Sequence, residues 1–203
     1  MSLEASQGRS DTTRIGQGTL VLIVGASGVG KDALIAGARE CLSNDPRFVF
    51  PERVITRPSN DAEHHASLSE TDFRKATRDG RFALAWQAHG LLYGVPASID
   101  VMIRRSQTVV VNVSRTIVTL ARQRYARVCV ILVECPPGLR AARLALRGRE
   151  AAGDIEARLA REVAAFDPAD ADVRIDNAGA LADGTRALIN ALSALPSRLS
   201  GRG

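Results

Sequence analysis

The chain has little cysteine, almost no lysine and no long apolar run. Its three cysteines cannot all pair in disulfides and show no metal-ligand spacing, so we expect them to fill the core of a protein from a reducing compartment. No apolar run is long enough to cross a bilayer, and residues 1–18 are polar, without the apolar stretch of a signal peptide. These absences predict a cytoplasmic protein that makes no contact with a membrane.

The positive charge comes almost entirely from arginine, because Lys31 and Lys75 are the only lysines. Lysine and arginine together number 27 against 22 acidic residues, which gives a net charge of +5. This balance favours an anionic partner, and the planar guanidinium suits phosphate oxygens. A GC-rich genome would give the same arginine content, so composition does not identify the partner. Nothing beyond the charge indicates nucleic acid, and we expect none to bind.

The stretch TLVLIVGASGVGKDAL, residues 19–34, carries the main motif. Its apolar run, residues 20–24, predicts a strand buried on both faces. Gly25, Gly30 and Lys31 then fit the pattern G-x-x-x-x-G-K. Glycines let successive backbone N–H groups turn around an anion, and the positive end of the next helix dipole points to the same place. We therefore predict a phosphate-binding loop, with Lys31 reaching the outer phosphates.

Asp32 stands where this motif has serine or threonine, whose hydroxyl contacts Mg²⁺. Two interpretations remain open. The carboxylate is a hard oxygen ligand that can hold Mg²⁺ directly or through a water. Alternatively, Asp32 is an acidic residue of the first helical turn that interacts favourably with the helix dipole.

Apolar strands alternate with helices along the chain. We expect strands at residues 20–24, 48–56, 108–113, 128–134 and 172–175, and helices at residues 32–42, 69–79, 99–105, 115–125, 137–146, 155–166 and 181–195. This alternation predicts a three-layer α/β fold, with a parallel sheet covered by helices and ligands bound at the carboxyl ends of the strands.

The remaining segments are expected to be irregular or terminal. Residues 59–67 form a polar stretch, residues 82–89 a short extended run, and residues 90–96 a turn. The length of the chain predicts one domain, residues 17–196, between disordered tails at residues 1–16 and 197–203.

Arginines gather around a glycine-containing turn late in the chain. They are Arg140, Arg143, Arg147, Arg149 and Arg158. A lid that closes over a transferring phosphoryl group needs such charges, although Arg140 and Arg143 fit a solvated helix face equally well. Arg53 and Arg57 flank an extended segment, as a clamp for a second phosphorylated substrate would. The chain has no D-x-x-G after a strand and no N-K-x-D, so we do not expect a GTPase.

Several short motifs together resemble the guanylate kinase group, from about residue 19 to residue 195. They are GASGVGK, RVITRP, YGV, and LRGRE followed by RLAR. In detail the chain is similar to one subgroup, the ribose 1,5-bisphosphate phosphokinases of the carbon–phosphorus lyase pathway. The marks of that subgroup are GKD in place of GKS or GKT, ITRP followed by Glu63-x-His65, A-x-L-S-E at residues 66–70, and W-x-A-H-G-L-x-Y-G at residues 86–94.

The resemblance implies a guanylate-kinase-like P-loop NTPase fold, with a substrate-binding insertion at about residues 53–96 and an arginine-rich lid at about residues 147–154. It also implies an enzyme that uses ATP and Mg²⁺ and phosphorylates a small phosphorylated sugar. The γ-phosphoryl group of ATP would pass to ribose 1,5-bisphosphate and give 5-phosphoribosyl 1-diphosphate (PRPP) and ADP.

The resemblance also assigns roles to individual residues. The ATP side would consist of Gly25, Ala26, Ser27, Gly28, Val29, Gly30, Lys31 and Asp32, with Asn177 near the adenine. The acceptor side would consist of Arg53, Arg57, Glu63, His65, His89, Tyr93, Asn112 and Ser114. The catalytic charges would come from Lys31, Arg147, Arg149 and Arg158. The histidines would contact the ribose or face solvent.

The chain also departs from guanylate kinases. Leu84, Asn112 and Ser114 stand where that group has acids that read the N–H groups of guanine, which argues against a guanine acceptor. The nearest alternative is nevertheless a nucleoside monophosphate kinase acting on GMP. A second is a guanylate-kinase-like binding module without catalysis, although such modules lose the phosphate loop and lid arginines that this chain keeps. The oligomeric state is left open, with a homodimer as one alternative.

Overall fold

The computed structural model describes residues 14–57, 65–88, 90–146 and 167–195. Its centre is a five-stranded sheet in the order β2-β7-β1-β8-β9, in which every neighbouring pair is parallel. The strands are β1 Thr19–Val24, β2 Phe48–Val49, β7 Thr108–Asn112, β8 Val128–Glu134 and β9 Val173–Asp176. The predicted parallel α/β sheet is confirmed, and the strand that precedes the phosphate loop lies at its middle.

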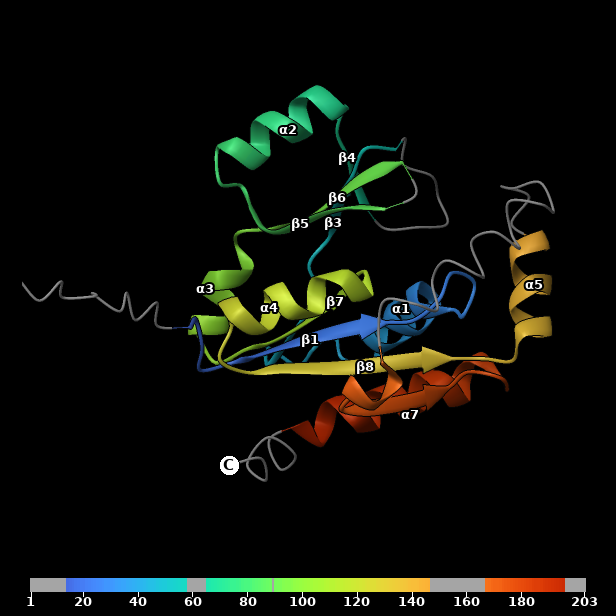
Figure 1. The fold of residues 1–203 in the computed structure, drawn as a ribbon. Coiled ribbons are helices and arrows are strands. Elements are labelled where there is room, and N and C mark those ends of the chain that lie inside the picture. The colour runs from blue at the N-terminus through green and yellow to red at the C-terminus, as the bar shows by residue number, and fades with distance from the viewer. Residues whose placement is uncertain (1–13, 58–64, 89, 147–166, 196–203) are drawn as a thin grey trace, which may run out of the picture.

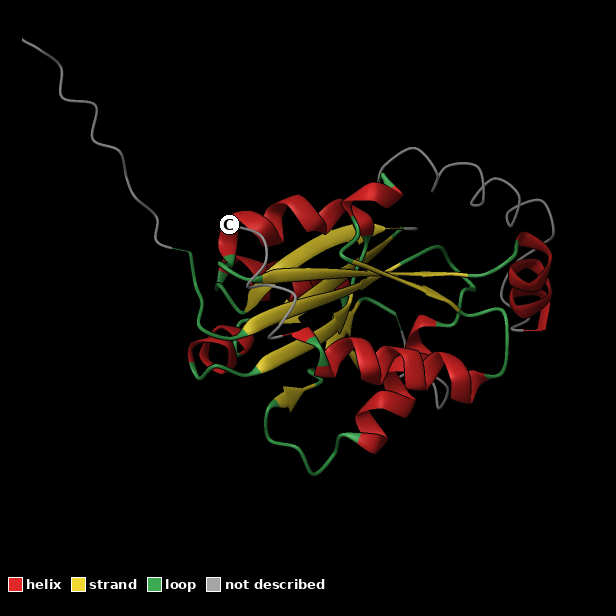
Figure 2. Cartoon of the chain, turned by 90° about the horizontal axis from the view of Figure 1, so that it is seen from below, coloured by secondary structure: helices red, strands yellow, loops and turns green. Residues whose placement is uncertain are grey.

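Helices cover both faces of this sheet (Figure 1, Figure 2). Leu20 and Leu22 of β1 pack with residues of α3 Ile99–Arg104 and α4 Val118–Arg124, while Val21 and Ile23 pack with α1 Lys31–Cys41 and α7 Leu181–Ser193. Alternate residues of a strand point to opposite faces, so a strand buried on both sides must be apolar throughout. The continuous apolar run of β1 and its complete burial therefore have the same cause.

A second, smaller sheet lies above the first in the view of Figure 1. Its strands, in the order β4-β3-β6-β5, are β3 Arg53–Ile55, β4 His65–Ser67, β5 Phe82–Ala88 and β6 Leu91–Pro96. The helix α2 Glu70–Arg78 packs on this sheet, where Phe73 stacks on Phe82 with ring centroids 4.5 Å apart. Residues 69–72 read S-x-x-D, a pattern typical of a helix start, and Ser69 caps α2 by accepting a hydrogen bond from the backbone N–H of Asp72.

Two strand predictions are wrong. The single strand expected at residues 48–56 is two strands, β2 in the central sheet and β3 in the second, separated at Phe50, Pro51 and Glu52. Proline has no N–H to give to a ladder, so a strand tends to end there. The turn expected at residues 90–96 is strand β6, which pairs with β5 in a hairpin, and the polar stretch 59–67 ends in β4.

The remaining described elements differ little from expectation, and the helix expected at residues 155–166 lies outside the described residues. The helix expected at residues 115–125 begins with a short 3₁₀ turn, η1 Arg115–Ile117, before α4. The helix α5 Pro137–Leu146 follows β8, and the 3₁₀ turn η3 Pro168–Asp170 precedes β9. Of the cysteines expected in the core, Cys129 is buried but Cys41 is exposed at the end of α1.

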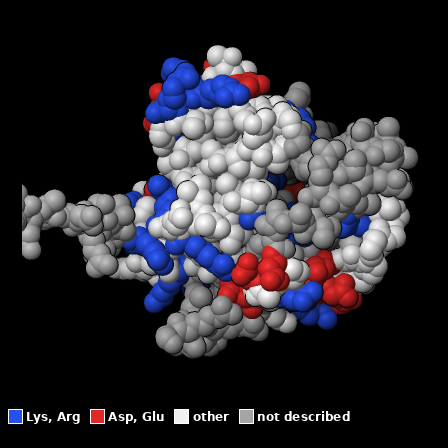
Figure 3. All heavy atoms as spheres, in the orientation of Figure 1, with Lys and Arg blue, Asp and Glu red and all other residues white. Residues whose placement is uncertain are grey.

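The surface shows scattered positive charge. On the face shown in Figure 3, Lys and Arg side chains form separate groups, one of them over α2, and acidic side chains lie between others. Within the described segments, no helix combines the length and apolar character needed to cross a bilayer.

A buried tyrosine joins α3 to the end of α4. The hydroxyl of Tyr125 donates to Oδ1 of Asp100 at 2.6 Å, and Nη2 of Arg124 donates to Oδ2 of the same carboxylate at 2.5 Å. Burial of the phenol and its hydrogen bond to Asp100 raise the pKa of Tyr125 above the ordinary 10.0.

We predict that Tyr125→Phe lowers the free energy of unfolding by about 1.5–3 kcal/mol, because a hydrogen bond to a carboxylate is lost. The difference from wild type should shrink above about pH 10, where the unfolded tyrosine ionises while the folded one stays protonated and wild-type stability falls. Urea unfolding of both proteins from pH 8 to pH 11 measures this. A difference that stays constant over that range would contradict the buried hydrogen bond.

Candidate active site

The candidate site lies at the carboxyl ends of the central strands. The loop at residues 25–30 follows β1, Asn112 ends β7 beside Ile23, and Asn177 follows β9. In parallel strands these ends share one edge, so residues far apart in the chain meet there. The structure thus brings together the loop, Asn112 and Asn177.

The loop has a backbone that non-glycine residues rarely adopt. Gly25, Gly28 and Gly30 have φ angles of +149°, +83° and +94°, and a Cβ on Gly30 would lie 2.5 Å from Nδ2 of Asn177. The backbone N–H groups of Gly28, Val29 and Gly30 donate no hydrogen bond to another described residue. Unpaired N–H groups before the first turn of a helix form a site for an anion, and this loop therefore fits a phosphate chain.

Lys31 is the first residue of α1 and turns back across the loop. Its Nζ donates to the carbonyl oxygens of Gly25 at 2.6 Å and Ala26 at 2.8 Å. The ammonium group therefore lies over the same loop whose N–H groups are open. A cation and several N–H donors directed at one place define a polyanion site.

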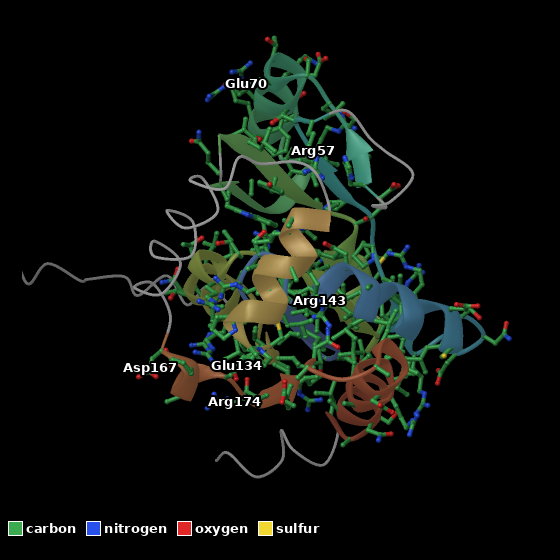
Figure 4. The ribbon with its side chains drawn as sticks, turned by 90° about the vertical axis from the view of Figure 1, so that its right-hand side faces the viewer. Arg57, Glu70, Glu134, Arg143, Asp167 and Arg174 are labelled. Carbon is green, nitrogen blue, oxygen red and sulfur yellow. The ribbon has the colours of Figure 1, made fainter. Side chains whose placement is uncertain are left out.

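Two side chains from outside the loop hold its backbone. Asn177, which is buried, donates from Nδ2 to the carbonyl of Val29 at 2.8 Å. Arg143 of α5 donates to the carbonyl of Val29 at 3.3 Å and to that of Asn177 at 3.0 Å. Figure 4 shows Arg143 at the middle of the molecule, away from Arg57 in the second sheet. From the sequence, Arg143 could be a lid arginine or part of a solvated helix face, and neither alternative included this contact, which joins distant chain segments and leaves no local motif.

Asp32 lies between the two sheets. Its Oδ1 accepts hydrogen bonds from Nδ2 of Asn112 at 2.7 Å and from Nη2 of Arg53 at 3.2 Å. Arg53 begins β3, so this ion pair joins the first turn of α1 to the second sheet. Neither interpretation of Asp32 drawn from the sequence included this partner.

Apart from Ser114, the other described acceptor residues predicted from the sequence lie in or beside the second sheet. Tyr93 stacks on Trp86 with ring centroids 5.3 Å apart, and Arg57 follows β3. His65 is buried, and neither of its ring nitrogens bonds to a described residue. Ser114 lies after β7, where its hydroxyl caps η1.

Five predicted site residues lie outside the described part of the chain. They are Glu63, His89, Arg147, Arg149 and Arg158. The lid expected at residues 147–154 lies there as well, so these assignments remain predictions.

A parallel sheet with a glycine-rich phosphate loop after its central strand, and a second sheet beside that loop, defines a P-loop kinase of the guanylate kinase type. The structure of guanylate kinase from Anaplasma phagocytophilum shares this fold, with a TM-score of 0.63, 17% identity, and coverage of 91% of this chain and 95% of that one. A gluconokinase from Sinorhizobium meliloti 1021 is similar with a TM-score of 0.52 and 19% identity, over 92% of this chain and 97% of the other. No protein-family model matches the chain.

Curated relatives identify one family within this class of kinases. A ribose 1,5-bisphosphate phosphokinase PhnN from Bradyrhizobium diazoefficiens is 43% identical over 192 residues, which cover 95% of this chain and 96% of the relative. Another, from Pseudofrankia inefficax, is 47% identical over 184 residues, 89% of this chain and 94% of the relative. The chain belongs to the ribose 1,5-bisphosphate phosphokinase PhnN family, which confirms the family suggested by its motifs.

We predict that Asn177→Ala weakens binding of ATP and of inorganic tripolyphosphate to a similar extent, about 10-fold, because it removes a hydrogen bond that shapes the loop. Isothermal titration calorimetry measures both ligands, and Asn190→Ala on the exposed side of α7 is the matched control. A loss confined to ATP would instead support the adenine contact expected from the sequence.

Proposed function

We propose that this chain transfers the γ-phosphoryl group of ATP to the 1-phosphate of ribose 1,5-bisphosphate, giving PRPP and ADP. The observation that carries the proposal is the phosphate loop, which Lys31 crosses. Asp32, the residue after Lys31, forms an ion pair with Arg53 of the second sheet. Ribose 1,5-bisphosphate, the acceptor proposed here, appears in the name of the relatives that are 43% and 47% identical over most of the chain.

The donor side fits a nucleoside triphosphate. Open N–H groups at residues 28–30 would hold the phosphates, and Lys31 would leave the loop carbonyls to neutralise the outer ones. Asp32 is a hard oxygen donor beside this position and would hold Mg²⁺, directly or through a water. When bound, Mg²⁺ supplies positive charge at the β- and γ-phosphates.

The acceptor side is the second sheet and its flanking loops, residues 53–96. Arg57 and Tyr93 would bind an acceptor phosphate, and the ribose would lie between them and the loop. His65 would donate to a ribose hydroxyl, because its buried ring nitrogens bond to no described residue and a buried polar group needs a partner. The domain would comprise residues 17–196, with a lid at residues 147–154.

The chemical step needs no general base. An oxygen of the 1-phosphate is already ionised, so it attacks the γ-phosphorus in line, and the bond between that phosphorus and the bridging oxygen of ADP breaks. Positioning and charge neutralisation then account for the rate. Lys31 would supply this charge, as would Arg147, Arg149 and Arg158 in the lid.

We further propose that the enzyme works in the cytoplasm, where ribose 1,5-bisphosphate would come from phosphonate breakdown and PRPP would feed later synthesis.

The test uses purified protein with Mg·ATP and, in parallel, ribose 1,5-bisphosphate or GMP. ADP release is followed and products are identified by mass. The proposal expects PRPP from the sugar bisphosphate and no GDP. Turnover of GMP alone would establish a guanylate kinase and overturn our interpretation of Leu84 and Ser114. Failure of both substrates would support a binding module without catalysis.

We predict that Lys31→Ala lowers kcat about 10²- to 10³-fold, because one charge that stabilises the transition state is lost. Lys75 is the only other lysine and provides the control, since it is exposed on α2 and pairs with Asp79. Lys75→Ala should turn over like wild type. Near-normal turnover by Lys31→Ala would refute the assigned role of the loop.

A further inference from the structure

His65 is a buried polar side chain whose hydrogen-bonding groups are unused among the described residues. The residue is 4% exposed, and neither ring nitrogen has a partner in the part of the chain that the structure describes. A neutral imidazole carries one N–H donor and one lone pair that accepts. Buried polar groups are nearly always hydrogen-bonded, because burial without a partner costs free energy. The imidazole therefore calls for a partner beyond the described residues.

His65 lies on the face of the second sheet that is directed at the phosphate loop. In the parallel pair of β3 and β4, His65 is the register partner of Arg53. Residues paired in this way have side chains on the same face, and neighbouring strands lie about 4.8 Å apart. Arg53 bonds to Asp32, the residue after Lys31, so this face is turned toward the first turn of α1. The imidazole thus begins one strand away from the contact between the second sheet and α1.

The neighbours of His65 on this face have partners within the protein. Arg53 donates to Asp32. Ser67, two residues further along β4, donates to the backbone carbonyl of Arg57 at 2.7 Å. These side chains are held by the chain itself, whereas the imidazole of His65 is available to a group that enters between the sheets.

The chemistry of the proposed acceptor indicates which group that is. The 1-phosphate, which attacks, must lie against the donor phosphates and therefore close to Lys31. The ring hydroxyl nearest to this phosphate is the 2-hydroxyl, on the carbon next to C1. His65 lies one strand from the contact that brings the second sheet to Asp32, so it is placed for this hydroxyl.

We propose that His65 donates a hydrogen bond to the 2-hydroxyl of the acceptor and thereby selects ribose over 2-deoxyribose bisphosphates. This inference rests on the proposed function and adds to it a choice between two classes of sugar phosphate. A 2-deoxy sugar leaves the buried imidazole without a partner. It is therefore rejected through the cost of an unpaired buried group as well as through the lost hydrogen bond.

Calorimetry without ATP or Mg²⁺ tests this selection with ribose 1,5-bisphosphate and its 2-deoxy and 3-deoxy analogues. Wild type should bind ribose 1,5-bisphosphate about 10- to 100-fold more tightly than the 2-deoxy analogue. His65→Phe keeps an aromatic ring but has no nitrogen. It should weaken ribose 1,5-bisphosphate by a similar factor and change the 2-deoxy analogue less than about 2-fold. The affinity ratio of ribose 1,5-bisphosphate to the 3-deoxy analogue should be the same in both proteins.

Two further variants accompany His65→Phe. His65→Gln keeps an N–H donor and should retain part of the selectivity, so it also serves if the phenylalanine variant does not fold. Gln87→Leu is the matched control, because it removes an exposed polar side chain from the same sheet. It should bind all three ligands like wild type. Thermal unfolding checks the fold of each variant, and the ratio of kcat/KM for the two sugars gives the same comparison during turnover with Mg·ATP.

Three results would overturn the assignment. The first is equal use of ribose and 2-deoxyribose bisphosphates by wild type. The second is an equal loss for both sugars in His65→Phe, which would give the imidazole a structural role alone. The third is a loss in His65→Phe that depends on the 3-hydroxyl instead. Failure of the proposed function appears separately, as absence of PRPP when wild type is given ribose 1,5-bisphosphate and Mg·ATP.

Discussion

The site depends on one constraint, which is that the backbone N–H groups of Gly28, Val29 and Gly30 donate to no described residue. Water or a neighbouring carbonyl would satisfy them in most loops. In this loop glycines allow positive φ angles, and Asn177 and Arg143 bond to the carbonyl of Val29 from outside. The carbonyls of Gly25, Ala26 and Val29 therefore accept hydrogen bonds, whereas the N–H groups of residues 28–30 donate to no described residue.

Charge balance connects this loop to the second sheet. Asp32 adds a negative charge beside a loop that suits polyanions, and this charge alone would weaken phosphate binding. Arg53 offsets that charge at 3.2 Å, and Asn112 satisfies the same oxygen. The substitution within the motif and the arginine on β3 are therefore parts of one arrangement, and neither is explained without the other.

The sequence predicted what local patterns determine. Both-face burial of β1, the phosphate loop and the Ser69 cap follow from a few adjacent residues, and the structure has all three. It did not predict that residues 48–56 divide between two sheets. Apolar residues on both sides of Pro51 favour extended structure, but they do not indicate which sheet each half joins. The contacts of Arg143 with Val29, and of Asp32 with Arg53, join segments 114 and 21 residues apart. Such pairs depend on how elements pack, which a single sequence does not encode in any local pattern.

The break between β2 and β3 at Pro51 bears on how the second sheet could move relative to the first. The chain leaves the central sheet at residues 50–52 to enter the second sheet at β3, and it leaves the second sheet after Pro96. These two connections define an axis about which the smaller sheet could rotate. In any rotation about that axis, displacement grows with distance from it. Arg53, the first residue past one crossing, would travel least, while Arg57 and α2 would sweep a wider arc. Arg53, which is ion-paired to Asp32, thus lies close to this axis, whereas Arg57 and α2 lie where a rotation would displace the chain most.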